Sequence, residues 1–433
     1  MTDDLLTTNE AASLLRVSQK TVLRLVRSGQ LRAHKVGRAW RIRRCDLLAD
    51  TESVGNIVYL DDNASSPIHP DVRRAMAEVL SGPVGNASSS HYTGARSREL
   101  VEEARERVAL LVGARRSEVV FTSGATEANN LILKGFSFDR RPRLVTSAGE
   151  HASVARVAEH LAANDLVEHS IIPLCHSGEP DLGALRSRID DRVGLVSVVA
   201  ANPETGILSQ IREIVELSHD VGAIVHCDAT QWVGRLPFSM DTLGVDAISL
   251  SAHKMSGPQG VGALVARRSL LRQLTPQLLG GGHENGLRSG TYNVAGVSGF
   301  GLAASIAADP TDARRVAHLR DRLIDQLSNL AGAVQNGSAS RLPNTVNLRF
   351  PGVPGDVLLA RTPGVAASLG SACHSGAFEP SPTLIAMGLT PEAAGESIRF
   401  SLSRFTTAAE IDQAVTAIAA SAAEIRSLNE DVA

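Results

Sequence analysis

The sequence predicts an α/β protein whose mainly parallel sheet is covered by helices. A small helix-turn-helix domain precedes this part, and a smaller α+β domain follows it. Short apolar runs alternate with amphipathic segments from about residue 57 to 300, which is typical of βα units. The first 52 residues differ from the rest in charge, and residues 301–433 combine helical segments with strand-like runs at 344–350 and 397–402. We therefore expect three domains, over residues 1–52, 57–300 and 301–433.

Composition narrows the class of protein. The chain has 433 residues, of which 43% are hydrophobic and 21% charged, as in ordinary globular proteins with a large core. It contains no run of 18 apolar residues, and its N-terminus, Met1-Thr2-Asp3-Asp4, is acidic, so we expect a cytoplasmic protein without a signal peptide or membrane segment. Four cysteines are too few for a disulfide framework and their spacing fits no zinc site, so we expect free thiols and no metal.

The head of the chain, residues 1–52, is basic. It contains ten Lys/Arg and six Asp/Glu and so carries +4, whereas residues 53–433 carry −7. A basic head on an acidic body indicates a separate module with an anionic partner. The expected elements are an N-cap at Thr8, a helix over 9–15, an N-cap at Ser18, a helix over 19–28 with Val22, Leu25 and Val26 inward, a stop at Gly29, and a hairpin over 31–42 turning at Gly37-Arg38.

This segment resembles the winged helix-turn-helix of the excisionase and MerR-like families. The resemblance implies that the second helix enters the DNA major groove and that the hairpin rests on the phosphates. The basic residues fall where phosphate contact would need them. A basic solvated domain used for protein contact is the alternative. The candidate DNA-contacting residues are Gln19, Lys20, Arg24, Arg27, Lys35, Arg38 and Arg41.

Residues 51–56 are the expected linker, and residues 56–60 the first strand of the second unit. Further strands and helices are expected where periodicity changes between two and 3.6 residues. The expected strands are 118–122, 143–146, 194–200, 223–226, 247–250 and 261–266, and the expected helices include 97–111 and 211–221.

Two core strands end in side chains of opposite charge. One is followed by Asp228, and the run 245–254 ends in Lys254 before a glycine-rich turn. Pyridoxal phosphate requires such a pair, because a lysine forms the Schiff base and an acid keeps the pyridine nitrogen protonated, so that the ring withdraws electrons. A lysine at a strand end is by itself more often a solvated charge. Its pairing with Asp228 favours the cofactor.

The segment 119–130 offers a place for the cofactor's phosphate. A strand ends at Thr122, a turn follows, and a helix begins at Ala125 with Thr126 in its first turn. Backbone N–H groups at a helix start bind anions, although an ordinary strand–helix junction would show the same pattern. Ser251 and His253 are further candidate donors to this phosphate.

Several motifs together resemble the cysteine desulfurases, pyridoxal-phosphate enzymes of the class V aminotransferase superfamily. The motifs are residues 122–127, 226–231, the Lys254 segment, 280–284 with 288–291, 371–375 and 397–402. They span about residues 58–405, and the Ser-Ala-Cys context resembles the group I enzymes. The resemblance implies fold type I of pyridoxal-phosphate enzymes, with a mainly parallel seven-stranded sheet in the large domain, and a homodimer.

The resemblance also implies a role for each residue of the site. Lys254 would carry the cofactor, Asp228 would pair with the pyridine nitrogen, and Gln231 would bond the ring hydroxyl. His151 would stack on the ring and shuttle protons, and Arg399 would bind the substrate carboxylate with its fork-shaped guanidinium. The phosphate would be held by Ala125, Thr126, Ser251 and His253, and by Thr291 of the neighbouring subunit.

Cys373 would be the nucleophile. It lies in a run of small residues and glycines over 361–376, which predicts the exposed and mobile loop that a sulfur carrier requires. His374 can help form the reactive thiolate, or can be an ordinary loop histidine. The remaining cysteines, Cys45, Cys175 and Cys227, are expected to have no catalytic role.

One position departs from the family's pattern. Within residues 201–206 the family usually has two successive asparagines, the second of which bonds the ring hydroxyl. Here the second is Pro203, which has no side-chain donor and no N–H. Either Gln231 makes this contact alone or Asn202 shifts to help, so Asn202 is a candidate binding residue. Residues 62–67 also vary the family's early polar turn.

The predicted reaction converts L-cysteine to L-alanine, with the sulfur kept as a persulfide on Cys373 until a protein or small acceptor takes it. A selenocysteine lyase or cysteine-sulfinate lyase would share the cofactor site. A transcription regulator that senses pyridoxal phosphate is an alternative of another class, although it would not need the nucleophile. A bifunctional protein could dock the sulfur donor on DNA, for sulfur modification of DNA or for control of its own operon.

Overall fold

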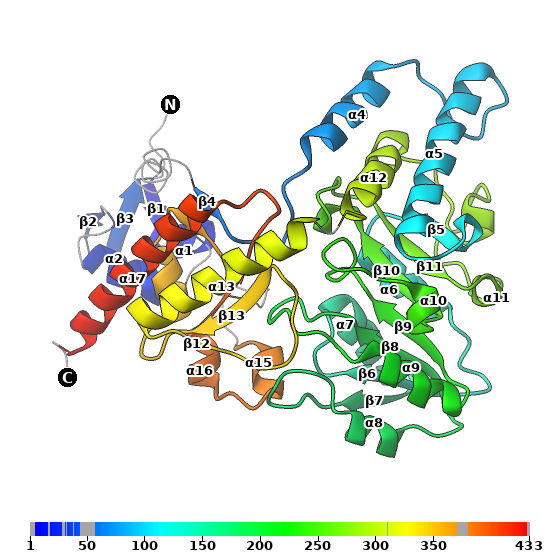
Figure 1. Ribbon diagram of the computed structural model, residues 1–433. Helices are drawn as coiled ribbons and strands as arrows, with labels where there is room; N and C mark the ends of the chain where they lie inside the picture. Colours follow the sequence, from blue (N-terminus) through cyan, green and yellow to red (C-terminus); the bar gives the residue numbers. More distant parts are fainter. Residues whose placement is uncertain are drawn as a thin grey trace. The chain divides into compact units, whose positions relative to one another are not determined.

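The computed structural model describes residues 5–15, 18–27, 31, 33–37, 39–43, 57–309, 311–369 and 380–430 (Figure 1). The chain divides into two compact units. Unit 1 comprises Met1–Asp61, His318–Asn336 and Val346–Ala433, and unit 2 comprises Asp62–Ala317 and Gly337–Thr345.

Unit 2 is built on a seven-stranded sheet in the order β5-β11-β10-β9-β8-β6-β7. Strand β11 runs antiparallel to both of its neighbours and the other neighbouring pairs are parallel, which confirms the mainly parallel sheet. The six predicted strands are present within two residues of their expected bounds, and β7 was not predicted. The bounds are β5 (Val119–Thr122), β6 (Arg143–Ser147), β7 (Glu168–Ile172), β8 (Val193–Val199), β9 (Ile224–Asp228), β10 (Ala247–Ser251) and β11 (Gly262–Ala266).

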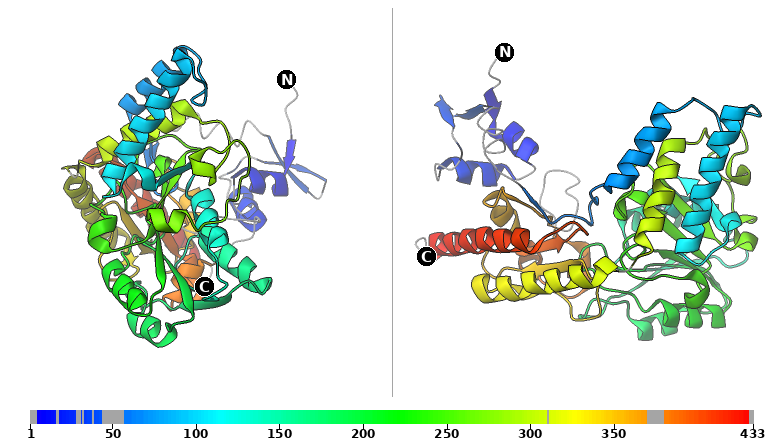
Figure 2. Two further views of the ribbon diagram at one scale, coloured as in Figure 1. Left: turned by 90° about the vertical axis from the view of Figure 1, so that its right-hand side faces the viewer. Right: turned by 45° about the horizontal axis from the view of Figure 1, so that its top comes forward.

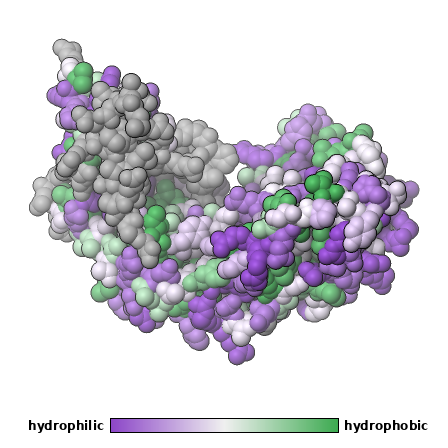
Figure 3. Space-filling model, turned by 90° about the horizontal axis from the view of Figure 1, so that it is seen from above, coloured by the Kyte–Doolittle hydropathy of each residue, from purple (hydrophilic) through white to green (hydrophobic). Residues whose placement is uncertain are grey.

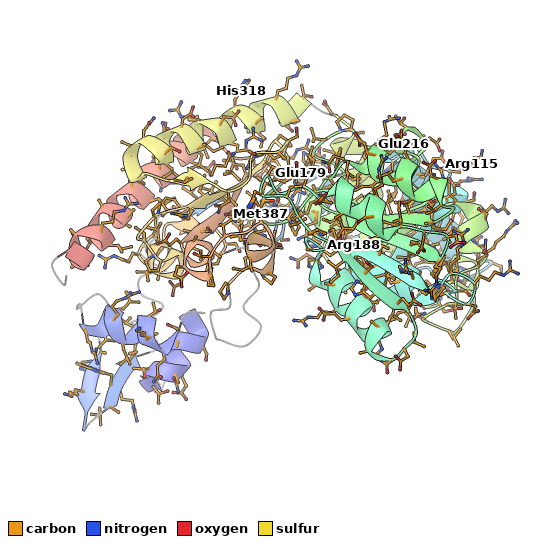
Figure 4. All side chains as sticks on the ribbon, turned by 90° about the horizontal axis from the view of Figure 1, so that it is seen from below. Arg115, Glu179, Arg188, Glu216, His318 and Met387 are labelled. Carbon is orange, nitrogen blue, oxygen red and sulfur yellow. The ribbon has the colours of Figure 1, made fainter. Side chains whose placement is uncertain are left out.

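Helices cover both faces of this sheet, because its strands are apolar on both sides. One face packs against α5 (Tyr92–Leu111), α8 (Leu182–Arg188), α9 (Ile211–Asp220) and α12 (Val294–Ala307). The other packs against α6 (Ala125–Gly135), α7 (Ala152–Ala163) and α11 (Arg268–Leu271). Figure 2 shows α4 (Pro70–Ser81) and α5 beside α12, and Figure 4 labels Arg188 on α8 and Glu216 on α9. Shorter elements are α10 (Met240–Leu243), η1 (Arg116–Glu118), η2 (Ala252–Lys254) and η3 (Glu284–Gly286).

Three helices of unit 2 begin with a histidine as the N-cap. The Nδ1 atoms of His69, His91 and His151 accept hydrogen bonds from backbone N–H groups in the first turns of α4, α5 and α7, at 3.2, 3.2 and 3.1 Å. An imidazole nitrogen here takes the place of the hydroxyl or carboxylate oxygen that most N-caps use. These three helix starts therefore depend on an unprotonated Nδ1.

The C-terminal part of unit 1 combines a small sheet with helices. Its sheet has the order β12-β13-β15, which confirms the two strands predicted in this region. Strand β4, expected at the start of the second unit, pairs in parallel with β14. The bounds are β4 (Val58–Tyr59), β12 (Val334–Gln335), β13 (Thr345–Arg349), β14 (Val365–Ala366), β15 (Ser397–Ser401), α13 (Thr311–Ala331), α14 (Gly355–Ala360), α15 (Pro382–Ala386), α16 (Pro391–Gly395) and α17 (Ala408–Glu430).

The head forms two helices and a three-stranded antiparallel sheet in the order β1-β3-β2. The predicted hairpin is confirmed, and Gly37 turns it with a φ of 65°. The predicted cap at Ser18 is also confirmed, since its Oγ accepts the Thr21 N–H at 3.1 Å. The bounds are β1 (Leu5–Thr7), α1 (Thr8–Leu15), α2 (Gln19–Arg27), β2 (His34–Val36) and β3 (Ala39–Arg43).

The cap predicted at Thr8 was wrong by one residue. Thr7 Oγ1 accepts the Glu10 N–H at 3.2 Å, and the Thr7 N–H donates to Glu10 Oε2 at 2.7 Å. This reciprocal capping box needs an acid three residues after the cap, which Thr7 has and Thr8 lacks. Strand β1, which was not predicted, ends at Thr7 and so fixes where α1 begins. Gly29 and the linker predicted at 51–56 lie outside the described residues.

Among the described helices, none combines the length and the apolar character needed to cross a bilayer. The face in Figure 3 shows hydrophilic residues interspersed with small hydrophobic groups.

Candidate active site

The predicted residues of unit 2 gather at one edge of the sheet. Strands β5, β6, β8, β9 and β10 all run in the same direction, so their carboxyl ends lie at the same edge. In open α/β sheets this edge is where ligands bind. The residues that follow these strands are Ala125 and Thr126 after β5, His151 after β6, Asn202 after β8, Asp228 and Gln231 at the end of β9, and Ser251, His253 and Lys254 at the end of β10.

Asp228 is a buried carboxylate held by neutral donors. Its Oδ2 accepts from Asn129 Nδ2 at 2.8 Å and its Oδ1 from the Thr230 N–H at 3.1 Å. Two residues earlier, His226 lies between Ser197 Oγ at 2.8 Å and Ser249 Oγ at 2.9 Å. Burial lowers the pKa of His226 to about 4, so this imidazole is neutral near pH 7. In this arrangement the Asp228 carboxylate can pair with the protonated pyridine nitrogen of a bound cofactor.

A chain of hydrogen bonds joins Asp228 to His151. Asn129 Nδ2 donates both to Asp228 and, at 2.8 Å, to Ser153 Oγ, which lies 2.7 Å from His151 Nδ1. Because His151 Nδ1 also accepts the Ser153 N–H, we assign the proton of the neutral imidazole to Nε2. Sequence reasoning missed Asn129 and Ser153, although Asn129 is one helical turn after Ala125 on α6.

Glu150, beside His151, is a further residue that sequence reasoning missed. Its Oε1 accepts from the Ser147 hydroxyl and, at 2.9 Å, from the Val199 N–H. Burial raises the pKa of Glu150 to about 8, and the negative charge of Asp228 adds to this rise. Glu150 is therefore mainly protonated near pH 7 and adds little negative charge beside Asp228.

Lys254 and Gln231 meet at one backbone carbonyl. Lys254 Nζ donates to Asn63 O and, at 2.9 Å, to Ala64 O. Gln231 Nε2 donates to the same Asn63 O at 3.0 Å. The amine predicted to carry the cofactor and the amide predicted to bond the ring hydroxyl therefore lie side by side.

The start of α6 adjoins the end of β10, as phosphate binding requires. A Cβ added to Gly124 would lie 3.7 Å from Ser251 Oγ, and one added to Gly262 would lie 2.6 Å from Gly124 Cα. His253 Nδ1 lies 3.2 Å from Ser65 Oγ. Burial and the cations of Lys254 and Arg235 lower the pKa of His253 to about 4, so it would meet a phosphate as a neutral donor.

These residues fit pyridoxal phosphate. The edge offers an amine at Lys254, a buried carboxylate at Asp228, an amide at Gln231 and a helix start next to two hydroxyl side chains, Thr126 and Ser251. This donor set matches an aldehyde, a ring nitrogen, a ring hydroxyl and a phosphate respectively.

The remaining predicted residues lie elsewhere or are engaged otherwise. Asn202 is buried, and its Oδ1 accepts from the N–H groups of Glu204 and Thr205, both at 2.9 Å. Thr291 is exposed. Arg399 belongs to unit 1, where it is buried in β15 and donates to Asp61 Oδ1 at 2.7 Å.

Cys373 and residues 370–379 around it, together with Cys45 and Arg38, lie outside the described residues. For the first part of the run 361–376, the prediction of an exposed loop was wrong: Val365–Ala366 form β14, paired with β4, and Thr362 and Val365 are buried. Cys227 is buried in the core, where burial raises the pKa of its thiol, and Cys175 is partly exposed. The described residues contain no group of three or more His, Cys, Asp and Glu side chains that could hold a metal ion.

A mainly parallel sheet with this lysine, aspartate and helix start at one edge defines an enzyme of the pyridoxal-phosphate class. Residues 58–414 match the family model of class-V aminotransferases, and residues 5–49 match that of a helix-turn-helix domain. The chain belongs to the class V aminotransferase family and, within it, to the cysteine desulfurases, which are pyridoxal-phosphate dependent and act on L-cysteine.

Relatives support this assignment over most of the chain. A cysteine desulfurase of Frankia sp. (strain EuIK1) is 42% identical over 390 residues, which cover 86% of this chain and 93% of that protein. The structure of a NifS-like protein aligns with a TM-score of 0.79 and 33% identity, over 84% of this chain and 98% of that one. The structure of SspA in complex with cysteine aligns with a TM-score of 0.73 and 29% identity, over 81% and 99%.

Proposed function

We propose that Lys254, Asp228, His151 and Cys373 together remove sulfur from L-cysteine, leaving L-alanine and a persulfide on Cys373. The observation that carries the proposal is the shared acceptor of Lys254 and Gln231 at the edge that holds Asp228. In pyridoxal phosphate the aldehyde and the ring hydroxyl stand on adjacent carbons, so an amine and an amide side by side match them. The solved relative in complex with cysteine supports the substrate.

Each residue has a separate task in this proposal. Bound at this edge, the cofactor supplies an aldehyde for amino groups and a protonated ring that withdraws electrons. Lys254 Nζ binds the cofactor and moves the proton of the substrate Cα, while Asp228 holds the proton on the ring nitrogen. His151 presents Nε2 as the nitrogen through which it exchanges protons, and Arg399 binds the substrate carboxylate. Asn202 orders the turn before Glu204 and the loop at Gly149, to whose carbonyl it donates at 3.0 Å.

Cys373 acts in the sulfur step. Its thiolate attacks the substrate sulfur, the new S–S bond forms as the C–S bond breaks, and the substrate carbon takes a proton. L-Cysteine and a thiol thereby give L-alanine and a persulfide, without any external oxidant or reductant. This chemistry needs a reduced thiol, which supports a cytoplasmic location. An acceptor molecule then takes the sulfur.

Mass spectrometry after incubation with L-cysteine tests the nucleophile. We expect one added sulfur atom on the peptide containing Cys373, and none in Cys373→Ser. Cys175→Ser is the matched control, because this thiol is partly exposed and should not carry the sulfur. An adduct that persists in Cys373→Ser would show that another residue is the nucleophile.

We propose a homodimer in which Thr291 serves the phosphate site of the partner subunit. Its exposure in the single chain supports this proposal, as do the large apolar side chains of Leu80, Val84, Tyr92 and Leu279, which are 74–96% exposed. A mixed dimer contains one Lys254→Ala chain and one Thr291→Ala chain. If Thr291 acts across the interface, one of its two sites would combine the intact Lys254 of one chain with the intact Thr291 of the other. Mixing two inactive variants should then restore activity, whereas no recovery would mean that Thr291 acts within its own chain.

We propose that the head binds DNA. Gln19, Lys20, Arg24 and Arg27 are exposed on α2, the second helix, and Lys35 is exposed on the hairpin. Arg41 is half-buried and donates to Trp40 O, so its contribution would be smaller. Gel shifts of the full chain over a salt series test the proposal: affinity should fall steeply with salt, and binding that ignores salt would contradict phosphate contact.

A further inference from the structure

We propose that Arg235, held by Asp62, is a positioning residue that turns the Gln231 amide toward the cofactor's ring oxygen and strengthens it as a donor. The inference rests on the cofactor-binding role proposed above for Gln231.

The orientation of Gln231 follows from the chemistry of Arg235. Arg235 NH1 donates to Gln231 Oε1 at 2.8 Å and to the Gln231 backbone carbonyl at 2.9 Å. A guanidinium has five donors and no acceptor, so the amide oxygen must face it. The amide nitrogen therefore faces the opposite way, toward Asn63 O and the Lys254 amine.

Asp62 holds Arg235 in this position. Arg235 NH2 donates to Asp62 Oδ2 at 2.9 Å, and both side chains are only 7% exposed. Burial raises the pKa of Asp62, and the charge of Arg235 opposes that rise. Because loss of either partner would leave the other as an unpaired buried charge, each residue restricts the other to this geometry.

Gln231 is the side-chain amide available to bond the ring hydroxyl, because the other candidate positions, 202 and 203, cannot supply one. Pro203 has no side-chain donor, and its carbonyl accepts from Asn63 Nδ2 at 3.1 Å. Asn202, the other candidate, is engaged at both ends of its amide, with Gly149 O and with the N–H groups of its own turn. This supports the first of the two alternatives that the sequence left open for the ring hydroxyl.

Arg235 also strengthens Gln231 as a donor. A cation bonded to an amide oxygen draws electrons from the amide, and hydrogen bonds in such chains reinforce one another. A stronger donor on the ring oxygen makes that oxygen a poorer acceptor for the proton it shares with the lysine nitrogen. The protonation of the bound cofactor, and hence its colour, should therefore depend on Arg235, which does not touch the ring.

The test is a pH titration of the visible absorbance of the purified, cofactor-loaded protein. In Arg235→Met we expect the midpoint to move up by about one pH unit, since a charge-assisted hydrogen bond becomes an ordinary one. Arg235→Lys should give a smaller shift of the midpoint, because an ammonium group keeps the positive charge but replaces a guanidinium that donates to three oxygens. Arg143→Met is the control: it removes another Arg–Asp pair of unit 2, at 2.8 Å, and Arg143 begins β6, so it lies at the opposite edge of the sheet from Gln231, which follows the end of β9.

Two further variants separate the possible failures. Asp62→Asn/Arg235→Met removes both buried charges, so it tests the same shift if Arg235→Met alone does not fold. Gln231→Ala should move the midpoint at least as far as Arg235→Met. If Gln231→Ala shifts the midpoint while Arg235→Met and the double variant match Arg143→Met, the positioning role is wrong. If Gln231→Ala shifts nothing, the proposed role of Gln231 itself fails.

Discussion

The sheet edge of unit 2 and the helix-turn-helix head use charge in opposite ways. At the edge, Asp228, Asp62 and Arg235 are buried, and each has hydrogen-bond partners at fixed distances. On the head, Lys20 and Arg24 are exposed. Buried charges must be paired or hydrogen-bonded, and so their positions are defined by the fold, whereas exposed charges are solvated.

This difference determines what each region can do. The edge can discriminate between atoms of one small ligand, because its donors and acceptors are preorganised. The head offers a positive surface that suits a polyanion with regularly spaced charges. Substitutions should therefore act sharply and individually at the edge, and weakly and additively on the head.

The largest effect is expected for Lys254→Ala. Without the amine the cofactor has no covalent anchor and the Cα proton no base, so desulfurase activity should fall by about a thousandfold or more. The visible absorbance of the bound cofactor should change as well. Lys134→Ala, which removes an exposed lysine from α6, is the control. Unchanged absorbance in Lys254→Ala would refute the assignment of the edge.

The next effect is expected for Asn129→Ala. This change breaks the chain of hydrogen bonds between Asp228 and His151, and loss of a hydrogen bond to a buried charge should lower kcat by about 10- to 100-fold. Asn130→Ala serves as the control, because the Asn130 amide donates to the backbone carbonyl of Thr126 within the same helix. Equal losses in both variants would mean that the chain of bonds has no special role.

A smaller effect is expected for Arg24→Ala on the head. If Arg24 contacts a phosphate, the slope of log affinity against log salt should fall by about one, with little change in desulfurase activity. Arg156→Ala removes a cation that is 80% exposed on α7 and should leave DNA binding unchanged. An unaltered slope in Arg24→Ala would place the phosphate contacts on other residues.

The smallest effect is expected for Glu150→Gln, and it should appear in the pH dependence of the protein's stability. The pKa of Glu150 is raised from 4.5 to about 8 in the folded protein, so the folded state holds a proton that the unfolded state releases. Its contribution to stability is therefore complete below about pH 4.5 and is lost as the pH rises through 8. Melting temperatures should fall less steeply over this range in Glu150→Gln, and identical slopes would contradict the burial of this proton.

Periodicity and turn chemistry were enough to predict the sheet and the strand ends that form the edge. They missed β7 because this edge strand, Glu168–Ile172, begins with three polar residues and has one fully buried residue, so it lacks the apolar run of its neighbours. The N-cap of α1 was placed at Thr8 because strand β1, which ends at Thr7, is too short to show a periodicity in the sequence.

Local patterns could not reveal the contacts that orient the site. Arg235 and Asp62 are 173 residues apart, and Lys254 and Asn63 are 191 apart. Only the tertiary fold, which sets the turn at Asp62 and Asn63 against the ends of the strands, brings such residues together. The residues that bear chemistry were therefore predictable, while their supporting partners were not. Asn129 looked like an ordinary helix residue for the same reason.

The three histidine N-caps make the entrances of α4, α5 and α7 depend on single ring nitrogens. The acceptor is one atom of a rigid ring, so its position is set by the rotamer of the histidine. At His151 the same nitrogen also meets the Ser153 hydroxyl. The start of α7 and the chain of hydrogen bonds to Asp228 therefore share one atom, and a residue that capped this helix without an imidazole would leave that chain incomplete.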